Sequence, residues 1–432
     1  MATNSSYDAI VIGGGPAGSA AAAILAQKGR KVVLLEKERF PRYHIGESLI
    51  PYTYFPLKRI GMLDQMKRSH FTRKYSVQFV SISGKQSQPF YFSEQLHHEA
   101  ADTWQVLRSE FDQMLLNNAR AKGAEVMEET LVRETIEENG AVAGVRAVSR
   151  NGLTHDFHAP ITIDATGRDA FSLGRRGWKV RDPRLNKIAV WTYYKGAMRD
   201  PGIDEGATTV AYVPEKGWFW YIPLPNDIIS VGIVAEKDYL YRDSRDLKTV
   251  FHREAAVNRW IGQHLAAGQQ IGEYRVTGEY SYRSRHCAGD GLLLIGDAFA
   301  FLDPVFSSGV FLALRSAEMG ADAADAALEA GDCSASRFRD YGEQLCKGIE
   351  SMRRLVYTFY DHEFRFRTFL TRYPDLKGEM TDCLMGNLWL DFDPLFQAVA
   401  EFASVPAPLA HGVPLETGKE KTSSTNASTS AD

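Results

Sequence analysis

The stretch Asp8–Glu36, DAIVIGGGPAGSAAAAILAQKGRKVVLLE, decides the fold of this chain. Its first run, Asp8–Ile12, and its last, Arg30–Glu36, are short, apolar and bounded by turn residues, which is typical of buried parallel strands. The alanine-rich segment Pro16–Lys28 between them predicts a helix. The stretch therefore predicts a βαβ unit at the start of an α/β protein.

Three glycines in this stretch, Gly13, Gly15 and Gly18, form a GxGxxG pattern between the first strand and the helix. Gly13 makes the tight turn, Gly15 lets a pyrophosphate approach the backbone, and Gly18 lets the helix pack closely on the strand. Glu36 ends the second strand and can accept hydrogen bonds from ribose hydroxyls. The alternative is a glycine-rich turn of another α/β protein, with Glu36 as a solvated strand end. The residues expected to bind the dinucleotide here are Gly13, Gly15, Pro16, Ala17, Gly18, Glu36 and Lys37.

A distant segment favours FAD over a nicotinamide alone. Leu292–Asp297, LLLIGD, predicts a strand that ends at Asp297. An aspartate at the carboxyl end of such a strand lies where open α/β sheets bind ligands, and it can accept from ribityl hydroxyls. A helix predicted near Ser307–Gly309 offers backbone amides to an anionic flavin edge. The alternative for Asp297 is an N-cap or turn residue.

Further cofactor candidates lie between these segments. Arg108, which precedes a predicted helix, is expected to bind phosphate or the flavin edge, or to pair with Glu110 or Asp112 on the surface. Arg42 is expected to contact the cofactor phosphates or ring. Ser48, Gly309 and Val310 complete the cofactor residues that we predict.

The bulk properties exclude several classes of function. The 432 residues carry a formal net charge of −4 and no basic block, so nothing indicates nucleic-acid binding. The four cysteines show no CxxC spacing, and we predict neither a metal site nor a redox pair. Scattered thiols and an N-terminus without a signal pattern predict a cytoplasmic protein, and no apolar run is long enough to span a membrane.

The domain organisation follows from changes in pattern along the chain. We predict a Rossmann-like FAD-binding domain, an antiparallel β-sheet substrate domain that is indicated by alternating strands after residue 185, and a helical C-terminal region. The Ser/Thr-rich end of the chain predicts disorder. The expected bounds are 1–184 for the FAD-binding domain with interleaved substrate-domain strands near 74–105, 185–285 for the substrate domain, 286–330 for the return to the FAD-binding domain, 331–410 for the helical region and 411–432 for the disordered tail.

Several segments resemble the large flavoprotein monooxygenase superfamily, over residues 7 to about 330. These segments are GGGPAG, Pro41–Pro51 (PRYHIGESLIP), Val106–Asp112 (VLRSEFD), Ile163–Arg168 (IDATGR) and Leu292–Phe299 (LLLIGDAF). Within that superfamily, three features resemble the flavin-dependent halogenases, especially the branch that acts on phenols and carrier-bound aromatics. Trp218–Pro223 matches the family's WxWxIP pattern, Phe301–Gly309 matches FxxPxxSxG, and Lys74 falls where the family carries its catalytic lysine.

The resemblance implies a barrier and a halide site. Trp218, Trp220 and Ile222 alternate, so on a strand they share one face; with Pro223 they are expected to separate flavin from substrate. The alternative for these residues is ordinary sheet core. Backbone amides of the second motif are expected to bind chloride or bromide, unless they only touch the flavin as in hydroxylases. The halide residues that we predict are Pro304, Ser307, Ser308 and Gly309.

The resemblance also implies two catalytic residues. Lys74 is expected to hold hypohalous acid by hydrogen bonding or as a haloamine, for which it should be partly buried and have a lowered pKa. The alternative is a solvated lysine at a strand edge. Glu47, in a loop expected beside the flavin ring, would polarise the cofactor or the surroundings of Lys74.

The function that follows from the resemblance is an FADH2-dependent halogenase. A separate flavin reductase would supply FADH2, and a flavin hydroperoxide formed with O2 would oxidise the halide to hypohalous acid. The substrate would be an electron-rich phenol or pyrrole, free or bound to a carrier protein. The run after Gly309 lacks the glutamate of the tryptophan-acting branch, which argues against tryptophan. The alternatives are an NAD(P)H-dependent aromatic monooxygenase, a prenyl-chain reductase and a flavin-binding sensor without activity.

Overall fold

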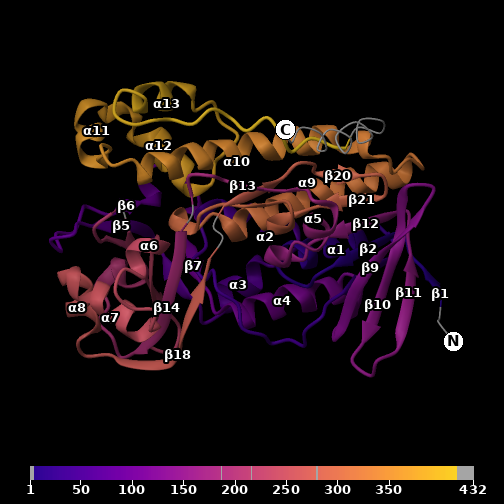
Figure 1. Cartoon of the computed structure of the whole chain (residues 1–432), viewed down its shortest axis with the longest axis horizontal. Coiled ribbons are helices and arrows are strands. Elements are labelled where there is room, and N and C mark those ends of the chain that lie inside the picture. Colours follow the sequence, from indigo (N-terminus) through magenta and orange to yellow (C-terminus); the bar gives the residue numbers. More distant parts are fainter. Residues whose placement is uncertain (1–3, 186, 216, 279–280, 416–432) are drawn as a thin grey trace, which may run out of the picture.

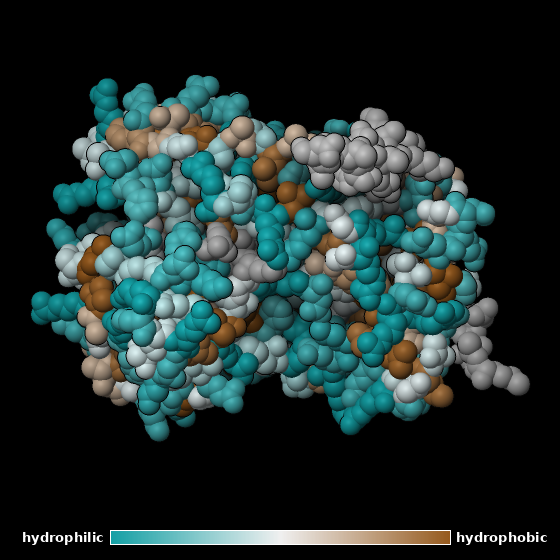
Figure 2. All heavy atoms as spheres, in the orientation of Figure 1, coloured by the Kyte–Doolittle hydropathy of each residue, from teal (hydrophilic) through white to brown (hydrophobic). Residues whose placement is uncertain are grey.

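The computed structural model describes residues 4–185, 187–215, 217–278 and 281–415. The molecule is elongated, with the βαβ unit and its sheet in one half and a second large sheet in the other (Figure 1). The C-terminal helices α10 to α13 lie along one long edge of the molecule. Figure 2 shows that hydrophilic residues cover most of the same face, with apolar residues in small scattered patches.

A six-stranded sheet forms around the predicted βαβ unit, which is confirmed, in the order β20-β21-β12-β2-β3-β8. Strand β20 is antiparallel to β21, and the other neighbours are parallel. Alternate residues of β2 contribute to two different cores, so the strand is buried on both faces. The bounds are β2 Ala9–Ile12, β3 Val32–Leu35, β8 Glu125–Met127, β12 Ile161–Asp164, β20 Ala288–Gly289 and β21 Leu292–Leu294.

Helices pack on one face of this sheet. Helix α1 (Pro16–Gln27) contacts both α4 (Arg108–Ala121) and α9 (Gly309–Glu329). A Cβ atom at Gly18 would lie 1.9 Å from the carbonyl oxygen of Gly13, so only glycine lets α1 approach the turn this closely. The other face is covered by a four-stranded sheet. Its strands are β1 Asn4–Ser6, β9 Thr130–Glu138, β10 Ala141–Ser149 and β11 Thr154–His158.

The second large sheet has seven strands in the order β18-β14-β17-β16-β15-β5-β6. All neighbours are antiparallel except β5 and β15, so two strands from the region near residues 74–105 join the predicted antiparallel sheet. The bounds are β5 Ser76–Val80, β6 Phe90–Tyr91, β14 Lys187–Lys195, β15 Thr208–Tyr212, β16 Trp218–Leu224, β17 Ile228–Glu236 and β18 Gln269–Thr277. A separate ribbon pairs β4 (Thr72–Lys74) with β7 (Thr103–Gln105).

Smaller elements complete the two halves of the molecule. Near the second sheet lie α6 (Lys237–Leu240), α7 (Leu247–Val257) and α8 (Arg259–Leu265). Between the halves runs a sheet of β13, β19 and β22. Its strands and the remaining short helices are β13 Lys179–Arg181, β19 Tyr282–Ser284, β22 Ala300–Phe301, α2 Tyr54–Arg59, α3 Leu63–Arg68 and α5 Phe171–Arg176.

The C-terminal region is helical, as the sequence predicts. Its helices are α10 Arg339–Tyr360, α11 Phe366–Arg372, α12 Lys377–Met385 and α13 Asp393–Val399. The tail predicted to be disordered from residue 411 differs at its start, because Val413 pairs with His286 and the Leu415 amide donates to the Ala288 carbonyl. Residues 416–432 lie outside the described residues. Among the described helices, none combines the length and apolarity needed to cross a bilayer.

Candidate active site

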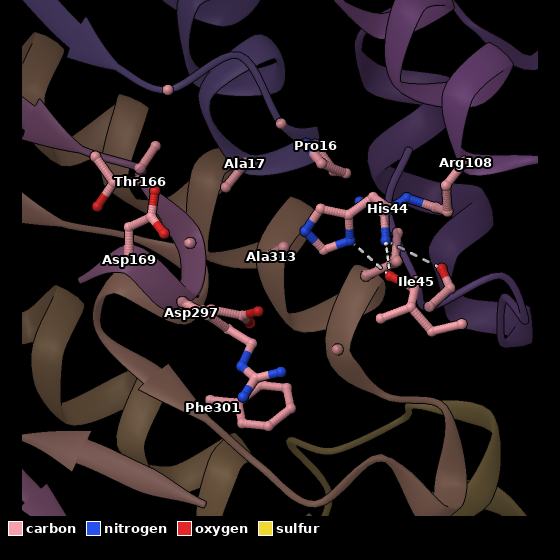
Figure 3. Close-up of a pocket in the computed structure, with 18 of the residues that line it drawn as sticks. Pro16, Ala17, His44, Ile45, Arg108, Thr166, Asp169, Asp297, Phe301 and Ala313 are labelled. Carbon is pink, nitrogen blue, oxygen red and sulfur yellow. Dashed lines mark hydrogen bonds between the residues drawn. The ribbon is translucent and has the colours of Figure 1, made fainter. Parts of the chain in front are cut away.

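A cavity of about 600 Å³ connects the glycine turn of the first sheet with the inner face of the seven-stranded sheet. Its size falls within the range of small-molecule and cofactor sites. Pro16 and Ala17 lie on one side of the open centre and Asp297 and Phe301 lie opposite them (Figure 3). The cavity therefore brings together the first and the later predicted cofactor segments.

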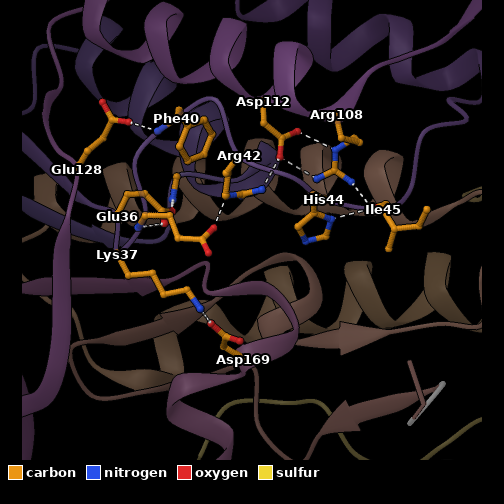
Figure 4. Close-up of polar contacts among 12 residues, drawn as sticks. Glu36, Lys37, Phe40, Arg42, His44, Ile45, Arg108, Asp112, Glu128 and Asp169 are labelled. Atoms are coloured by element: carbon orange, nitrogen blue, oxygen red, sulfur yellow. Dashed lines mark hydrogen bonds and ion pairs between the residues drawn. The ribbon is translucent and has the colours of Figure 1, made fainter. Parts of the chain in front are cut away.

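The glycine-turn end of the cavity suits a dinucleotide. Glu36 is buried at the end of β3, and its Oε2 accepts from the Gly14 amide at 2.7 Å. Gly15 and Lys37 line the same end, where Lys37 forms an ion pair with Asp169 (Figure 4). A Cβ atom at Gly15 would meet only the Arg42 Nη2 atom, at 3.6 Å, so the backbone is open to a phosphate.

Arg108 and Arg42 meet at one buried carboxylate. Arg108 donates from Nε and Nη2 to the two oxygens of Asp112 at 2.7 and 2.9 Å, and from Nη1 to the Ile45 carbonyl at 2.7 Å. Arg42 Nη1 also donates to Asp112, at 3.2 Å (Figure 4). The pairing of Arg108 with Asp112 is one of the alternatives that we predicted. The prediction that this pair lies on the surface is wrong, because Arg108 is buried. Arg108 thereby fixes the loop at Ile45 on the cavity wall.

Asp297 lies in the turn Gly296–Ala298, directly after β21, and lines the cavity. The N-cap of that turn is Ile295, so Asp297 is not an N-cap, but the other alternative, a turn residue, describes its backbone position. Burial raises the pKa of Asp297 to about 6, against the lowering effect of Arg168 and Arg108. Asp297 therefore presents a carboxyl group to the cavity.

The predicted halide segment forms the start of α9. Pro304, Ser307 and Gly309 line the cavity together with Val310, and Ser307 has a left-handed backbone with φ of 56°. A Cβ atom at Gly309 would meet no atom within 4 Å, so the first residue of the 21-residue helix faces open space. Ser308 is the N-cap, but its side chain is buried away from the cavity wall. A helix N-terminus with an open glycine suits an anion or a flavin edge.

Strand β16 carries the predicted barrier. Trp218, Trp220 and Ile222 all line the cavity, with the two indole centroids 6.3 Å apart. Phe219 packs on the opposite face of the sheet, in the apolar core against α7 and α8, which we call the second core. Pro223 alternates with the barrier residues, so it lies on the other face of the strand. It is absent from the described cavity lining, in contrast to its expected position in the barrier.

Lys74 is buried at the end of β4, with 2% of its surface exposed. Its Nζ donates to Ser48 Oγ and to the Leu49 carbonyl, each at 2.9 Å. Burial lowers the pKa of Lys74 to about 7. The strand-edge alternative is therefore wrong, and burial is complete rather than partial. Ser48, which we predicted to bind the cofactor, lines the cavity and separates it from the amine.

Glu47 lies on the cavity wall beside Ser48 and is 4% exposed. Its Oε1 accepts from the Tyr193 hydroxyl at 2.9 Å. Burial raises the pKa of Glu47 to about 7. Tyr193 was not predicted, and neither was Tyr360, which accepts from Trp218 Nε1 at 2.7 Å. Both tyrosines lie more than 140 residues from their partners, and no local pattern indicates such contacts.

The fold and this cavity define an FAD-dependent flavoprotein with two facing sheets. In agreement, residues 6–341 match the family described as FAD binding domain. The brominase of 1H-pyrrole-2-carbonyl-[peptidyl-carrier protein] from Pseudoalteromonas luteoviolacea is 32% identical and is matched over 89% of this chain and 93% of its own. Tryptophan 2-halogenase from Chondromyces crocatus is also 32% identical, over 88% of this chain and 72% of its own.

Solved structures agree with these relatives. The flavin-dependent brominase Bmp2 superposes with a TM-score of 0.84 at 28% identity, over 92% of this chain and 98% of its own. The chain belongs to the flavin-dependent halogenases, which confirms the resemblance, the FAD cofactor and the enzyme class expected from the sequence.

Proposed function

We propose that this halogenase installs chloride or bromide on an electron-rich pyrrole or phenol ring, and that the ring is tethered to a carrier protein. Two relatives support the tethered pyrrole: the brominase above and the corresponding chlorinase of Pseudomonas fluorescens, 29% identical over 94% of this chain and 96% of its own. The first turn of α9 contains no acidic residue, in line with the argument against tryptophan.

Some cavity residues would bind the cofactor and the halide, and others would keep the substrate apart from the flavin. Bound reduced FAD supplies the reduction of O2 that converts a halide to hypohalous acid. Gly15 and Glu36 would hold the dinucleotide, and the amides at the start of α9, near Gly309, would hold the halide. Trp218 and Trp220 form an apolar wall that keeps the aromatic substrate away from the flavin side.

The observation that carries the proposal is the buried amine of Lys74. With a pKa of about 7, a substantial fraction of this amine is neutral near neutral pH. A neutral amine can hold hypohalous acid by hydrogen bonding, and two fixed acceptors orient its Nζ. Holding a diffusible oxidant at one place is a proximity effect.

The test is the variant Lys74→Met with a flavin reductase, FAD, NADH and bromide. We expect brominated product, measured by mass spectrometry on a carrier-bound pyrrole and on free phenols, to fall by a factor of about 100 or more. FAD affinity and NADH consumption should stay unchanged. Arg73→Met is the control, since Arg73 is the neighbouring residue of β4 and packs on Trp104 instead. Product yield that is unaffected by Lys74→Met would remove the amine from the mechanism.

We also propose that a separate reductase supplies FADH2 in the cytoplasm. All four cysteines are free thiols, as a reducing compartment favours. Purified protein should oxidise NADH or NADPH only when a reductase is added. Rapid NAD(P)H oxidation by the protein alone would favour the aromatic monooxygenase instead.

A further inference from the structure

Halide oxidation at the flavin consumes a proton. The balanced reaction is FADH2 + O2 + X⁻ + H⁺ → FAD + HOX + H2O, so each turnover must bring one proton to the oxygen that leaves as water. This inference rests on the proposed function. The proton needs a donor among the residues that line the cavity.

Glu47 is the carboxyl group in the cavity wall with an unexplained oxygen. Its Oε1 accepts from Tyr193, and its Oε2 is buried with no close hydrogen bond in the described part of the chain, although the Ser230 hydroxyl lies near enough to lower the pKa of the carboxyl. Buried polar atoms are nearly always paired, so an unpaired one at a cavity calls for a ligand or a chemical role.

A chain of side chains leads outward from Glu47. The Tyr193 hydroxyl lies 3.0 Å from the Tyr43 hydroxyl, and Trp191 Nε1 donates to Tyr43 at 2.8 Å. An indole N–H can only donate. The Tyr43 oxygen therefore accepts from Trp191, its own proton points to Tyr193, and the proton of Tyr193 points to Glu47. The two tyrosine hydroxyls thus donate in the direction of the cavity.

The other end of this chain is accessible to solvent. Tyr43 is 43% exposed and itself lines the cavity, and the Arg275 guanidinium lies over its ring at 4.0 Å. Trp191 is buried in β14 and fixes the Tyr43 hydroxyl from the inner side. The chain therefore begins at a partly exposed residue and ends at a buried carboxyl on the cavity wall.

The charges around Glu47 suit a proton donor. Burial raises its pKa to about 7, while the Ser230 and Tyr193 hydroxyls and the Arg108 cation oppose that rise. A donor is most effective when its pKa lies near the working pH. His44, three residues away, has a pKa lowered to about 4 by burial and by Arg108, so it is neutral and is no competing donor.

We propose that Tyr43, Tyr193 and Glu47 form a proton relay from solvent to the flavin cavity. The O–H bond at Glu47 Oε2 breaks as a new O–H bond forms on the oxygen that leaves as water. Oε1 receives the proton of Tyr193, Tyr193 receives that of Tyr43, and Tyr43 is reprotonated by solvent. Rotation of the carboxyl group restores the starting state.

The first test needs neither flavin nor turnover. Infrared difference spectra of FAD-free protein should show a carboxyl C=O band that titrates near pH 7 and is absent in Glu47→Gln. Tyr193→Phe removes a hydrogen bond to the ionised form, so the midpoint of the band should move to higher pH. Tyr194→Phe is the matched control, because Tyr194 points into the second core on the other face of β14. No titrating band, or the same midpoint in Tyr193→Phe, would overturn the relay.

The second test follows hypobromite formation in a single turnover of protein loaded with reduced FAD. Wild-type protein should slow above about pH 7 and show a solvent deuterium isotope effect. Tyr193→Phe should slow the reaction by about tenfold or more with FAD affinity unchanged, and formic acid should restore the rate of Glu47→Ala. Wild-type rate, pH profile and isotope effect in Tyr193→Phe would refute the inference. A wild-type protein that oxidises neither bromide nor chloride would refute the proposed function, and the infrared titration would still decide whether the relay exists.

Discussion

At the scale of single residues, burial brings an acid and a base to the same pKa. Glu47 is raised to about 7 and Lys74 is lowered to about 7, in each case mainly because burial penalises the charged form. Ser48 links them, since it follows Glu47 in the chain and accepts from the Lys74 amine. Two groups whose pKa values are shifted toward neutral pH, both next to one serine, are typical of a catalytic centre.

The lowered pKa of Lys74 makes stability depend on pH. Between about pH 7 and the ordinary lysine pKa of 10.5, the unfolded chain binds a proton at Lys74 that the folded chain does not. Folding stability therefore rises with pH across this window. Across this window, the free energy of unfolding of the wild-type protein should rise, relative to that of Lys74→Met, by on the order of 5 kcal/mol at most. Urea denaturation at pH 7, 8.5 and 10 measures this gain. If the free energies of unfolding of the two proteins changed with pH in parallel, that result would contradict the burial of a neutral amine.

At the scale of elements, the end of α10 joins the barrier strand to the halide segment. Trp218 Nε1 donates to the Tyr360 hydroxyl, which donates to Asp303 Oδ2 at 2.9 Å. Phe359 packs on Trp218 and on Phe306 of the turn before α9. Helix α10 therefore holds both walls of the cavity in register, although it supplies none of the described lining residues.

Tyr360→Phe should loosen this junction. Loss of the hydroxyl leaves the Trp218 N–H and the buried Asp303 carboxyl without this partner, which should lower the free energy of unfolding by about 1–3 kcal/mol. Halogenated product per NADH consumed should fall, because the barrier no longer fits the halide segment. Chemical denaturation and product yield measure the two effects. Tyr373→Phe, away from the cavity, is the control, and an unchanged yield in Tyr360→Phe would limit the contact to stability.

At the scale of the whole molecule, a buried ionic network ties the C-terminal segment to the body of the protein. Arg353 on α10 pairs with Asp182 at 3.0 Å and with Glu350 at 3.1 Å, and Glu350 also pairs with Arg283 at 2.7 Å. The same two arginines donate to carbonyls of the final segment, at Ala407 and Leu409. The network connects the small sheet of β13 and β19, α10 and the segment around Ala407 and Leu409.

Arg353→Met should therefore destabilise the protein strongly. Removing one cation from a buried network leaves carboxylates without their partner and typically costs about 3–5 kcal/mol. Arg354→Met is a matched control, because the adjacent Arg354 pairs with a mostly exposed Asp393 and should cost about 1 kcal/mol or less. The difference between the urea midpoints of the two variants measures the contribution of the network to stability. Equal losses of stability in both variants would show that burial adds nothing to this contribution.

The sequence by itself determined the features that depend on near neighbours. The glycine turn, the βαβ unit and the shared face of Trp218 and Trp220 follow from spacing along one short segment, because local periodicity dictates which side chains share a face. The same periodicity places Pro223 on the other face, which the matched motif alone obscured. The halogenase family was also accessible, since its motifs are contiguous.

The tertiary structure alone decided which distant groups meet. Nothing near Lys74 in the chain indicates that Ser48 and Leu49 accept hydrogen bonds from its amine. Nothing near Glu47 indicates that Tyr193 donates a hydrogen bond to its carboxyl group. The burial that moves the pKa of Glu47 and Lys74 is likewise a property of the assembled halves. Contacts between segments far apart in sequence depend on how sheets and helices pack, and a local pattern carries no information about that packing.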